Sequence, residues 1–285
     1  MRVLVTGGAG RLGSEVVKLV ASRGDSAVAF DLPQVPWEAV KGLPGVEALP
    51  GDVTDKRCVS EAVGGVDAVI HLAALLPPRS EVNRGLTMRV NVDGTSNIVE
   101  TLVKTGAPLV FASSIATYGV TAPGEPPIRE SHPPQVHDLY SESKIEAERL
   151  IKSSGVDSVI LRIAPIAVAD LVELPETIPY RGDQRVEHIY LEDAAHALLS
   201  ALDEGEAKGQ TFNVAGGPTW QMTGAEYIGR FYDALGVEVE PNFSEEYTAV
   251  DWYDTSQGLS LGYQRTSFNG FLGKLRALGE QLGLR

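Results

Sequence analysis

The chain has 285 residues, of which 43% are hydrophobic and 22% charged, and its formal net charge is −14. These proportions are ordinary for one large globular domain, or one domain with a small appendage. The acidic balance argues against nucleic acid and anionic membrane surfaces as partners.

The residues that commonly form disulfides and metal sites are scarce. One cysteine, Cys58, excludes an intrachain disulfide, and the five histidines show no metal-ligand spacing. A strand begins within two residues of Met1, leaving no room for a signal peptide. The most apolar stretch, 156–169, is too short and too charged to span a bilayer. We therefore expect a cytoplasmic protein without a metal.

The first motif combines a strand, a glycine turn and a helix. Residues 2–6 are apolar and β-branched, Gly7, Gly10 and Gly13 follow, and apolar residues then recur at helical spacing over 14–22. The glycines permit a tight turn, close approach of a pyrophosphate and close helix–strand packing. The N-terminus of the helix then offers N–H groups to phosphates. A glycine triplet by itself is also consistent with a turn that binds nothing.

An acidic residue follows at the spacing that a dinucleotide site requires. The second apolar run, 26–30, leads into Asp31, about 20 residues after the last glycine, where a carboxylate binds a ribose 2′-OH. Because Asp31 repels a 2′-phosphate, we expect NAD rather than NADP.

Strand-like and helix-like runs continue to alternate along the chain. A Pro-rich loop, 32–36, and a short helical stretch come first, and Thr54 or Asp55 can cap a helix. The further runs are 46–50, 67–72, 84–104, 109–112, 140–153 and 158–163. This pattern predicts an α/β fold, a Rossmann-type doubly wound parallel sheet with helices on both faces. Its ligand lies at the carboxyl ends of the strands.

Several residues fall at those strand ends. Asp52 and Val53 are placed where an adenine ring would lie, although Asp52 is equally consistent with an ordinary turn aspartate. The small residues Ala73–Ala74 let a cofactor lie against the backbone, and Ser113–Ser114 end the next strand.

The pattern loosens after Pro165. An irregular stretch, 170–185, is followed by predicted elements at 191–202 (helix), 210–215 (strand), 223–235 (helix) and 267–282 (helix). We expect residues 1–165 to form the NAD-binding domain, with a strand and a helix contributed from 186–215. Residues 166–285 then form a small interleaved α/β substrate cap.

Tyr140 and Lys144 are four residues apart, on one face of a predicted helix. A nearby ammonium favours the phenolate, so the pair suits proton transfer at a substrate oxygen while a hydride moves. Ser114 could hold the same oxygen. A solvated helix face is the alternative interpretation.

Together these features resemble the extended short-chain dehydrogenases/reductases of the NAD-dependent epimerase/dehydratase type. The motifs that carry the resemblance are 6–13, Asp31, 51–53, 71–74, 91–95, 113–119, Tyr140-x-x-x-Lys144, 161–162, 189–194 and 212–214.

The resemblance implies roles for the site residues. Tyr140 is the acid/base, Lys144 lowers its pKa and binds the nicotinamide ribose, Ser114 binds the substrate oxygen, and Asn91 supports the cofactor side. The residues predicted to bind NAD are Gly7, Gly10, Arg11, Leu12, Gly13, Asp31, Asp52, Val53, Leu72, Ala73, Ala74, Asn91, Ser113, Tyr140, Lys144 and Pro165. The resemblance also implies a homodimer. We expect the helix containing Asn91 and the helix starting at Tyr140 to expose apolar faces to the partner.

Departures from the family pattern narrow the reaction and the substrate. Ile115–Ala116 replace the Asp-Glu pair of dehydratases, and Ile163–Pro165 replace the usual asparagine of nucleotide-sugar epimerases. Val186 occupies the position of the phosphate-binding arginine, with Arg185 one residue out of register. These departures favour a sugar, a sugar acid or a similar polar alcohol as substrate, without a nucleotide.

The candidate substrate-binding residues are Arg79, Ser114, Arg185 and His188; for the two arginines and His188, a solvated loop side chain is the alternative. The predicted function is hydride transfer at a secondary alcohol carbon, with dehydrogenase and epimerase both open. A non-catalytic NAD(H)-binding redox sensor or partner-binding module is the alternative.

Three further features are expected to be structural. His71 is predicted to be a packed, hydrogen-bonded histidine, and Asp193 to cap a helix. The acidic aromatic stretch 245–254 is predicted to be a cap surface or a subunit contact.

Overall fold

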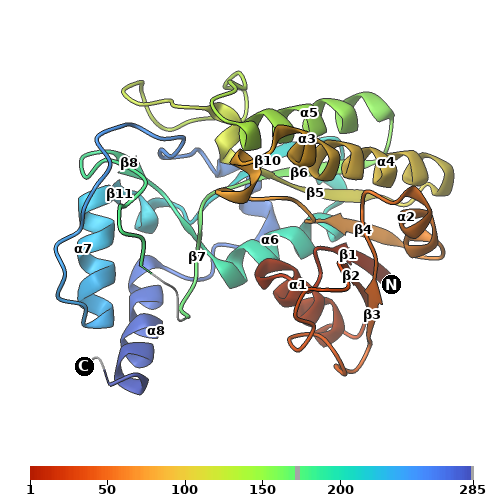
Figure 1. Cartoon of the computed structure of the whole chain (residues 1–285), viewed down its shortest axis with the longest axis horizontal. Helices are drawn as coiled ribbons and strands as arrows, with labels where there is room; N and C mark the ends of the chain where they lie inside the picture. Colours follow the sequence, from red (N-terminus) through yellow and green to blue (C-terminus); the bar gives the residue numbers. More distant parts are fainter. Residues whose placement is uncertain (171–173, 284–285) are drawn as a thin grey trace.

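The computed structural model describes residues 1–170 and 174–283 and contains a central parallel sheet of seven strands (Figure 1). Its strands are β1 (Arg2–Thr6), β2 (Ser26–Asp31), β3 (Val46–Pro50), β4 (Ala68–His71), β5 (Leu109–Ser114), β6 (Ser158–Ile163) and β10 (Thr211–Val214). The strand order is β10-β6-β5-β4-β1-β2-β3. This confirms the predicted doubly wound class. The order reverses between β1 and β4, where ligands bind in such sheets.

Helices cover both faces of the sheet. The first face carries α1 (Arg11–Ser22) and α6 (Leu191–Asp203), and the second carries α2 (Lys56–Val63), α4 (Gly94–Thr105) and α5 (Leu139–Ser154). Each face has its own hydrophobic core, because the strands between them bury side chains in both directions. Asp55 caps α2 as predicted, accepting hydrogen bonds from the backbone N–H groups of Arg57 and Cys58.

Two predicted helical stretches differ in the structure. The expected helix 84–104 is divided into α3 (Arg84–Met88), a π-helical turn (Arg89–Asp93) and α4. Hydrophobic spacing does not reveal such a turn, because a single turn is too short for its wider period to be distinguished from that of an α-helix. The prediction of a short helix after Pro36 is wrong, because the chain forms turns there.

The cap packs around a third, aromatic core. Its helices are α7 (Gly224–Leu235) and α8 (Phe268–Gln281), and its short strands are β7 (Ile166–Ala167), β8 (Arg185–Val186), β9 (Ile189–Tyr190) and β11 (Met222–Thr223). Trp220, Phe268 and Phe271 are fully buried there and contact one another. Positions 171–173 of the predicted irregular stretch lie outside the described residues. The domain boundaries remain a prediction.

Short 3-10 turns connect the larger elements. They are η1 (Arg79–Glu81), η3 (Ile115–Tyr118), η4 (Gly205–Ala207), η5 (Pro218–Trp220) and η6 (Ser256–Leu261). The prediction that Asp193 caps a helix is wrong, because α6 has no side-chain cap. The buried carboxylate of Asp193 accepts from the backbone N–H groups of Arg265 and Thr266, and so ties α6 to the C-terminal segment.

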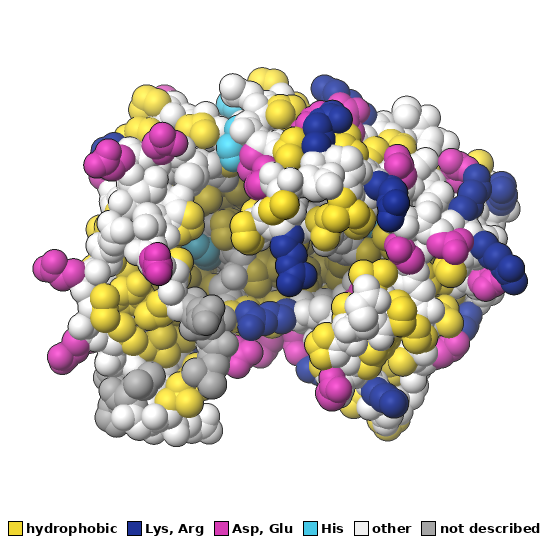
Figure 2. Space-filling view, viewed as in Figure 1, with side chains coloured by type: hydrophobic (Ala, Val, Ile, Leu, Met, Phe, Trp, Pro, Cys, Tyr) yellow, Lys and Arg dark blue, Asp and Glu magenta, His cyan; other side chains and the backbone are white. Residues whose placement is uncertain are grey.

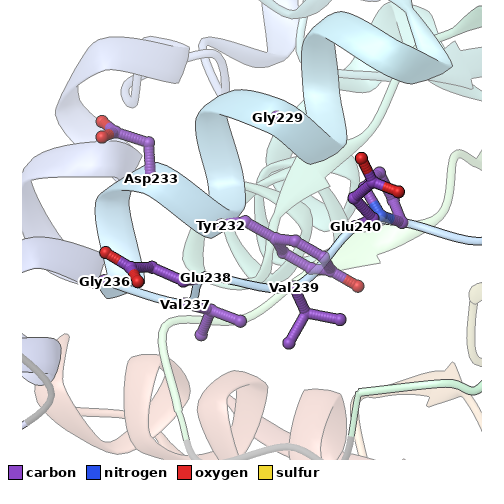
Figure 3. A pocket seen from close by; sticks show the side chains of 9 residues that line it. Gly229, Tyr232, Asp233, Gly236, Val237, Glu238, Val239 and Glu240 are labelled. Carbon is purple, nitrogen blue, oxygen red and sulfur yellow. The ribbon is translucent and has the colours of Figure 1, made fainter.

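A pocket on the cap lies beside the end of α7, where Tyr232 and Val237 form part of its wall (Figure 3). It contains no predicted site residue. Across residues 1–170 and 174–283, no helix is long and apolar enough to cross a bilayer. The same residues contain no group of three or more His, Cys, Asp or Glu side chains that could hold a metal ion.

The prediction that two helices expose apolar faces is wrong for the described residues. The large hydrophobic side chains exposed between positions 84 and 105 are Leu86 and Val103, near opposite ends of this segment, and α5 exposes none. The surface of α5 instead carries ion pairs, including Arg149–Glu146. The homodimer stays a prediction.

One buried ion pair joins α5 to the sheet. The Glu148 carboxylate of α5 accepts from Nε of Arg162 at 2.9 Å and from its Nη2 at 2.7 Å, and both side chains are almost fully buried. Ser113 of β5 donates to the same carboxylate at 2.6 Å. The Arg162 guanidinium lies over the Tyr118 ring, 4.7 Å from its centroid. The pair therefore holds α5, β5 and β6 together.

Glu148→Gln should destabilise the protein by about 3 kcal/mol, because it leaves the buried Arg162 charge uncompensated. Chemical denaturation measures this loss. Glu146→Gln on the exposed face of the same helix is the matched control and should change the midpoint little. Equal midpoints for the two variants would contradict the importance of the buried pair.

Candidate active site

The glycine turn is shaped so that side chains cannot fill it. Gly7 has a φ of +70°, and a Cβ on Gly13 would lie 1.9 Å from the Gly7 carbonyl oxygen. Gly10 is the N-cap of α1 and provides no side-chain cap. The first turn of α1 therefore lacks a side-chain partner and can receive a phosphate, so these residues fit a dinucleotide.

Asp31 lies against this turn, as the motif predicted. Its Oδ2 accepts from the Ala9 N–H at 3.1 Å, and its Oδ1 accepts from the Leu32 N–H at 2.8 Å. These bonds fix the carboxylate at the carboxyl end of β2. Arg11 is exposed beside the turn, whereas Leu12 packs partly on the core.

The neighbouring strand end is held by a buried hydroxyl. Thr6 Oγ1 accepts from the N–H groups of Leu72 and Ala73, at 3.1 and 3.2 Å. It also bonds to Nδ1 of His71 at 2.6 Å, while Nε2 of His71 lies 3.0 Å from the Thr95 hydroxyl. Burial lowers the pKa of His71 to about 3, so the imidazole is neutral. His71 is thus the packed histidine that the sequence predicted.

Asp52 and Val53 make structural contacts. The Asp52 carboxylate accepts from the Thr54 N–H at 2.8 Å, as a turn aspartate does. Val53 is buried, and its carbonyl accepts from Asn97 of α4 at 2.9 Å. A place for adenine beside them stays a prediction.

Ser114, Tyr140 and Lys144 come together between β5 and α5. Lys144 is buried, and its Nζ donates to the carbonyl of Ala112 at 2.8 Å, two residues before Ser114. The same Nζ lies 5.8 Å from the centroid of the Tyr140 ring. Burial lowers the pKa of Lys144 to about 8, and the charge of Glu148 opposes this shift.

The pKa of Tyr140 differs from the expectation. Burial raises it to about 12, and a side-chain hydrogen bond with Ser114 acts in the opposite direction. No lowering by Lys144 is found in this structure, because its ammonium is directed at the Ala112 carbonyl. Tyr140 therefore keeps its proton near neutral pH.

Asn91 lies in the π-helical turn and acts as a bridge. Its Oδ1 accepts from the Leu75 N–H, and its amide donates to the Leu75 carbonyl and to the Ser143 hydroxyl of α5. Both amide hydrogens are used within the protein. Asn91 therefore fixes the loop after β4 against α5, and its amide has no N–H left for a cofactor.

The candidate substrate-binding residues have different surroundings. Figure 2 shows a hollow between the sheet and the cap, with basic side chains on its wall. Arg79 is exposed in η1. Arg185 instead forms a bidentate pair with Asp251, with contacts of 2.6 and 3.0 Å, and donates to the Gly124 carbonyl. It is neither a free cation nor a solvated loop side chain.

His188 is buried rather than solvated. Its ring stacks on Tyr227 of α7 with centroids 4.1 Å apart, and its Nδ1 is buried without a partner among the described residues. Burial lowers its pKa to about 3, so His188 is neutral. The next residue, Ile189, donates its N–H to the carbonyl of Pro165, which places His188 beside the end of β6.

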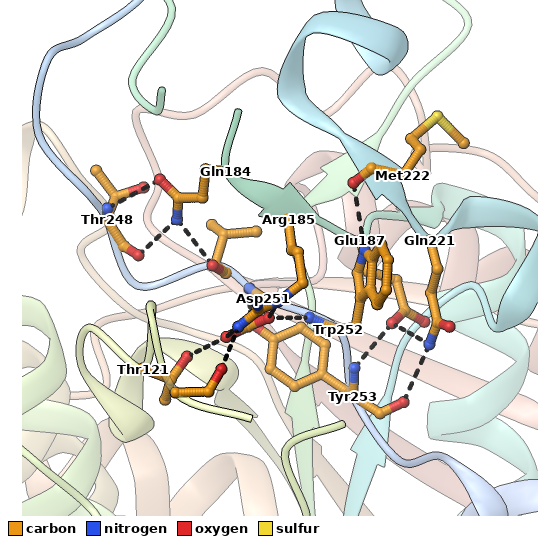
Figure 4. A network of polar contacts seen from close by, with 12 residues as sticks. Thr121, Gln184, Arg185, Glu187, Gln221, Met222, Thr248, Asp251, Trp252 and Tyr253 are labelled. Atoms are coloured by element: carbon orange, nitrogen blue, oxygen red, sulfur yellow. Dashed lines mark hydrogen bonds and ion pairs between the residues drawn. The ribbon is translucent and has the colours of Figure 1, made fainter. Parts of the chain in front are cut away.

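The stretch 245–254 lies at the surface, as predicted, only in its first three residues: 245–247 are exposed, whereas 248–254 are buried or half-buried. Asp251 and Tyr253 are buried, and Asp251 accepts from Arg185 and from the Thr121 hydroxyl (Figure 4). The Glu187 carboxylate, fully buried, accepts from the Tyr253 N–H. This stretch is therefore a strap between the cap and the loop after β5.

Sequence reasoning missed Glu148 and Glu187. A signal existed for Glu148, which follows Lys144 at helical spacing, because a charged Arg162 in an apolar strand needs an anion. Glu187 gave no such signal. Its carboxylate is satisfied mainly by backbone N–H groups that only tertiary folding brings near.

Comparisons with known proteins show the family to which the chain belongs. A family model described as the NAD dependent epimerase/dehydratase family matches residues 3–167. The chain belongs to this family, which confirms the predicted resemblance. The family's cofactor is the NAD predicted from Asp31.

The names of individual relatives differ. A 3 beta-hydroxysteroid dehydrogenase/Delta 5→4-isomerase of Mycobacterium tuberculosis is 32% identical over 94% of this chain and 76% of its own length. An uncharacterized protein of Sinorhizobium fredii is 29% identical over 79% of this chain, which spans 56% of that relative. The crystal structure of Thermus thermophilus UDP-glucose 4-epimerase, complexed with NAD, has a TM-score of 0.81 and 25% identity, with 99% of each chain covered.

Glu187 generates a pH dependence of stability. Burial raises the pKa of Glu187 from 4.5 to about 7, so the folded protein disfavours its ionised form. The resulting penalty is absent below about pH 4.5, grows with pH and is complete above about pH 7, at roughly 3 kcal/mol.

Glu187→Gln removes this penalty. The stability of the variant relative to the natural protein should therefore rise as the pH increases through that window. Thermal unfolding of both proteins across the window measures the difference. Parallel pH curves would contradict the buried carboxylate as the source.

Proposed function

We propose that the protein transfers a hydride between NAD and a secondary alcohol carbon, with Tyr140 as the acid/base. The observation that carries this proposal is the convergence of Ser114, Tyr140 and Lys144 at the carboxyl end of β5, on the edge of the sheet that also carries the glycine turn. The oxygen of an alcohol bound there would lie near the Ser114 hydroxyl, the Tyr140 phenol and the Lys144 ammonium.

The residues divide the work as follows. Bound NAD supplies the hydride acceptor. Ser114 hydrogen-bonds the substrate oxygen, and Tyr140 exchanges a proton with it. Lys144 is charged below about pH 8 and binds the nicotinamide ribose with its ammonium. Because the pKa of Tyr140 is about 12, its proton-donor form prevails near neutral pH, which suits carbonyl reduction; alcohol oxidation should accelerate as the pH rises.

The charges of the cap support a substrate without a diphosphate. Arg185 is paired with Asp251, and Arg181 forms two contacts with Asp183, at 2.7 and 2.8 Å. Arg185 is therefore held by a buried carboxylate, and Arg181 by a carboxylate at the surface. We therefore propose a sugar, a sugar acid or a similar polar alcohol as the substrate class.

A hydroxysteroid-like alcohol is the second candidate. Leu76 and Val82 follow β4 and are 56% and 83% exposed, so they present apolar surface on the segment fastened to α5. The named activity of the Mycobacterium tuberculosis relative supports the same substrate class. In that case an apolar skeleton would cover these side chains.

The reaction is tested with a panel of substrates. The purified protein is incubated with NAD and aldoses, uronic acids, polyols, nucleotide sugars and hydroxysteroids, and NADH absorbance is followed. One substrate should yield NADH, and Tyr140→Phe should lower the rate by about 100-fold or more. If NADH does not accumulate, NMR of the same mixtures separates an epimerase, which inverts a carbon, from a redox sensor, which leaves every compound unchanged. The last result contradicts the proposal.

The coenzyme preference is tested at Asp31. Asp31→Asn keeps an oxygen acceptor but removes the charge that repels a 2′-phosphate. We expect weaker NADH binding and stronger NADPH binding, about 10-fold in their ratio. Fluorescence titration measures both constants. Asp52→Asn is the matched control and should leave the ratio unchanged, and an unchanged ratio in Asp31→Asn would refute the assignment.

A further inference from the structure

The first turn of α5, which carries Tyr140, receives its hydrogen-bond acceptors from two carboxylates. The N-cap, Asp138, accepts from the Ser141 N–H at 2.7 Å. The N–H groups of Leu139 and Tyr140 instead donate to Oε2 and Oε1 of Glu81, at 2.9 and 3.1 Å. Since these N–H groups have no partner within a helix, Glu81 completes the cap from a distant part of the chain.

Both oxygens of Glu81 are held in place for this contact. Glu81 ends the η1 turn, and the Ser80 hydroxyl donates to its Oε1 at 2.7 Å. The Thr87 hydroxyl then donates to the Ser80 carbonyl at 2.6 Å, which ties η1 to α3. The Glu81 carboxylate is therefore held by a side-chain hydrogen bond within η1, and η1 is held by α3.

Two further contacts continue along the same side of α5. Arg84 pairs with Glu142, and the Asn91 amide donates to the Ser143 hydroxyl at 2.9 Å. The segment 75–91 thus holds α5 at successive positions that begin at Leu139. Of these contacts, those of Glu81 alone reach the backbone of Tyr140.

We propose that Glu81 is a positioning residue that sets the place of the Tyr140 phenol by fixing the backbone N–H of Tyr140. The proposal rests on the proposed function. The phenol must reach an oxygen held by Ser114 of β5, and Ser114 is fixed to the sheet independently of α5. A shift of about 1 Å at the start of α5 therefore separates the two groups, and such a shift costs about 100-fold in rate.

The geometry predicts a specific kinetic signature. Most residues predicted to bind the cofactor, including the glycine turn and Asp31, lie on elements other than α5, so the loss of Glu81 should weaken cofactor binding far less than turnover. Glu81 itself is exposed, so global stability should change little. A residue with a general structural role would instead lower stability, cofactor binding and turnover together.

The test compares three variants with the natural protein, using the substrate found in the panel above. Glu81→Ala should lower kcat by about 10- to 100-fold, with the KM for NAD and the melting midpoint close to the natural values. Glu81→Gln keeps one acceptor oxygen and replaces the other with a donor, so it should recover only part of kcat. Glu146→Ala, on the exposed face of the same helix, is the matched control and should behave like the natural protein.

Hydrogen exchange separates failure of this proposal from failure of the proposed function. The amides of Leu139 and Tyr140 should exchange about 10-fold faster or more in Glu81→Ala than in the natural protein or in Glu146→Ala. Natural kcat in Glu81→Ala overturns the proposal. If no substrate of the panel turns over, the proposed function fails, and unchanged exchange at these two amides then overturns the role of Glu81 by itself.

Discussion

The structure around Tyr140 depends on a buried ion pair between the helix α5 and the strand β6. Glu148 binds Arg162 of β6 and the Ser113 hydroxyl of β5, and so holds α5 where Lys144 reaches the Ala112 carbonyl. Burying charges is costly unless they are paired and hydrogen-bonded. Here the Glu148 carboxylate and the Arg162 guanidinium are paired and hydrogen-bonded. The neighbouring side chains on α5, such as Lys144, are therefore held in a defined position.

The cofactor side of the site depends on a different constraint, the space between backbones. Gly13 approaches the Gly7 carbonyl so closely that any side chain would collide, and the turn thereby lets α1 begin directly above β1. Asp31 is tied to this turn through the Ala9 N–H, so the groups predicted to bind phosphate and ribose are joined directly. The two constraints meet at the carboxyl edge of the sheet.

The proposal of a substrate without a nucleotide depends on the charges of the cap. Asp251 neutralises Arg185, and the strap 245–254 runs between the cap and the loop after β5. Glu187 holds this strap through the Tyr253 N–H and the Gln221 amide. Arg185, the residue next to the register of the family's phosphate-binding arginine, is thus used to close the fold.

The sequence by itself determined the parts that depend on local spacing. The alternation of apolar runs predicted the parallel sheet, the glycine positions and Asp31 predicted NAD, and the Tyr140–Lys144 spacing placed both residues on one helix face, because strand and helix periods are properties of short segments. Only the tertiary structure decided which charges are free. Arg185 pairs with Asp251, and His188 is buried against Tyr227. Burial raises the pKa of Tyr140, whereas the sequence had predicted a lowered value. Partners and desolvation depend on residues far apart in the chain, which no local pattern records.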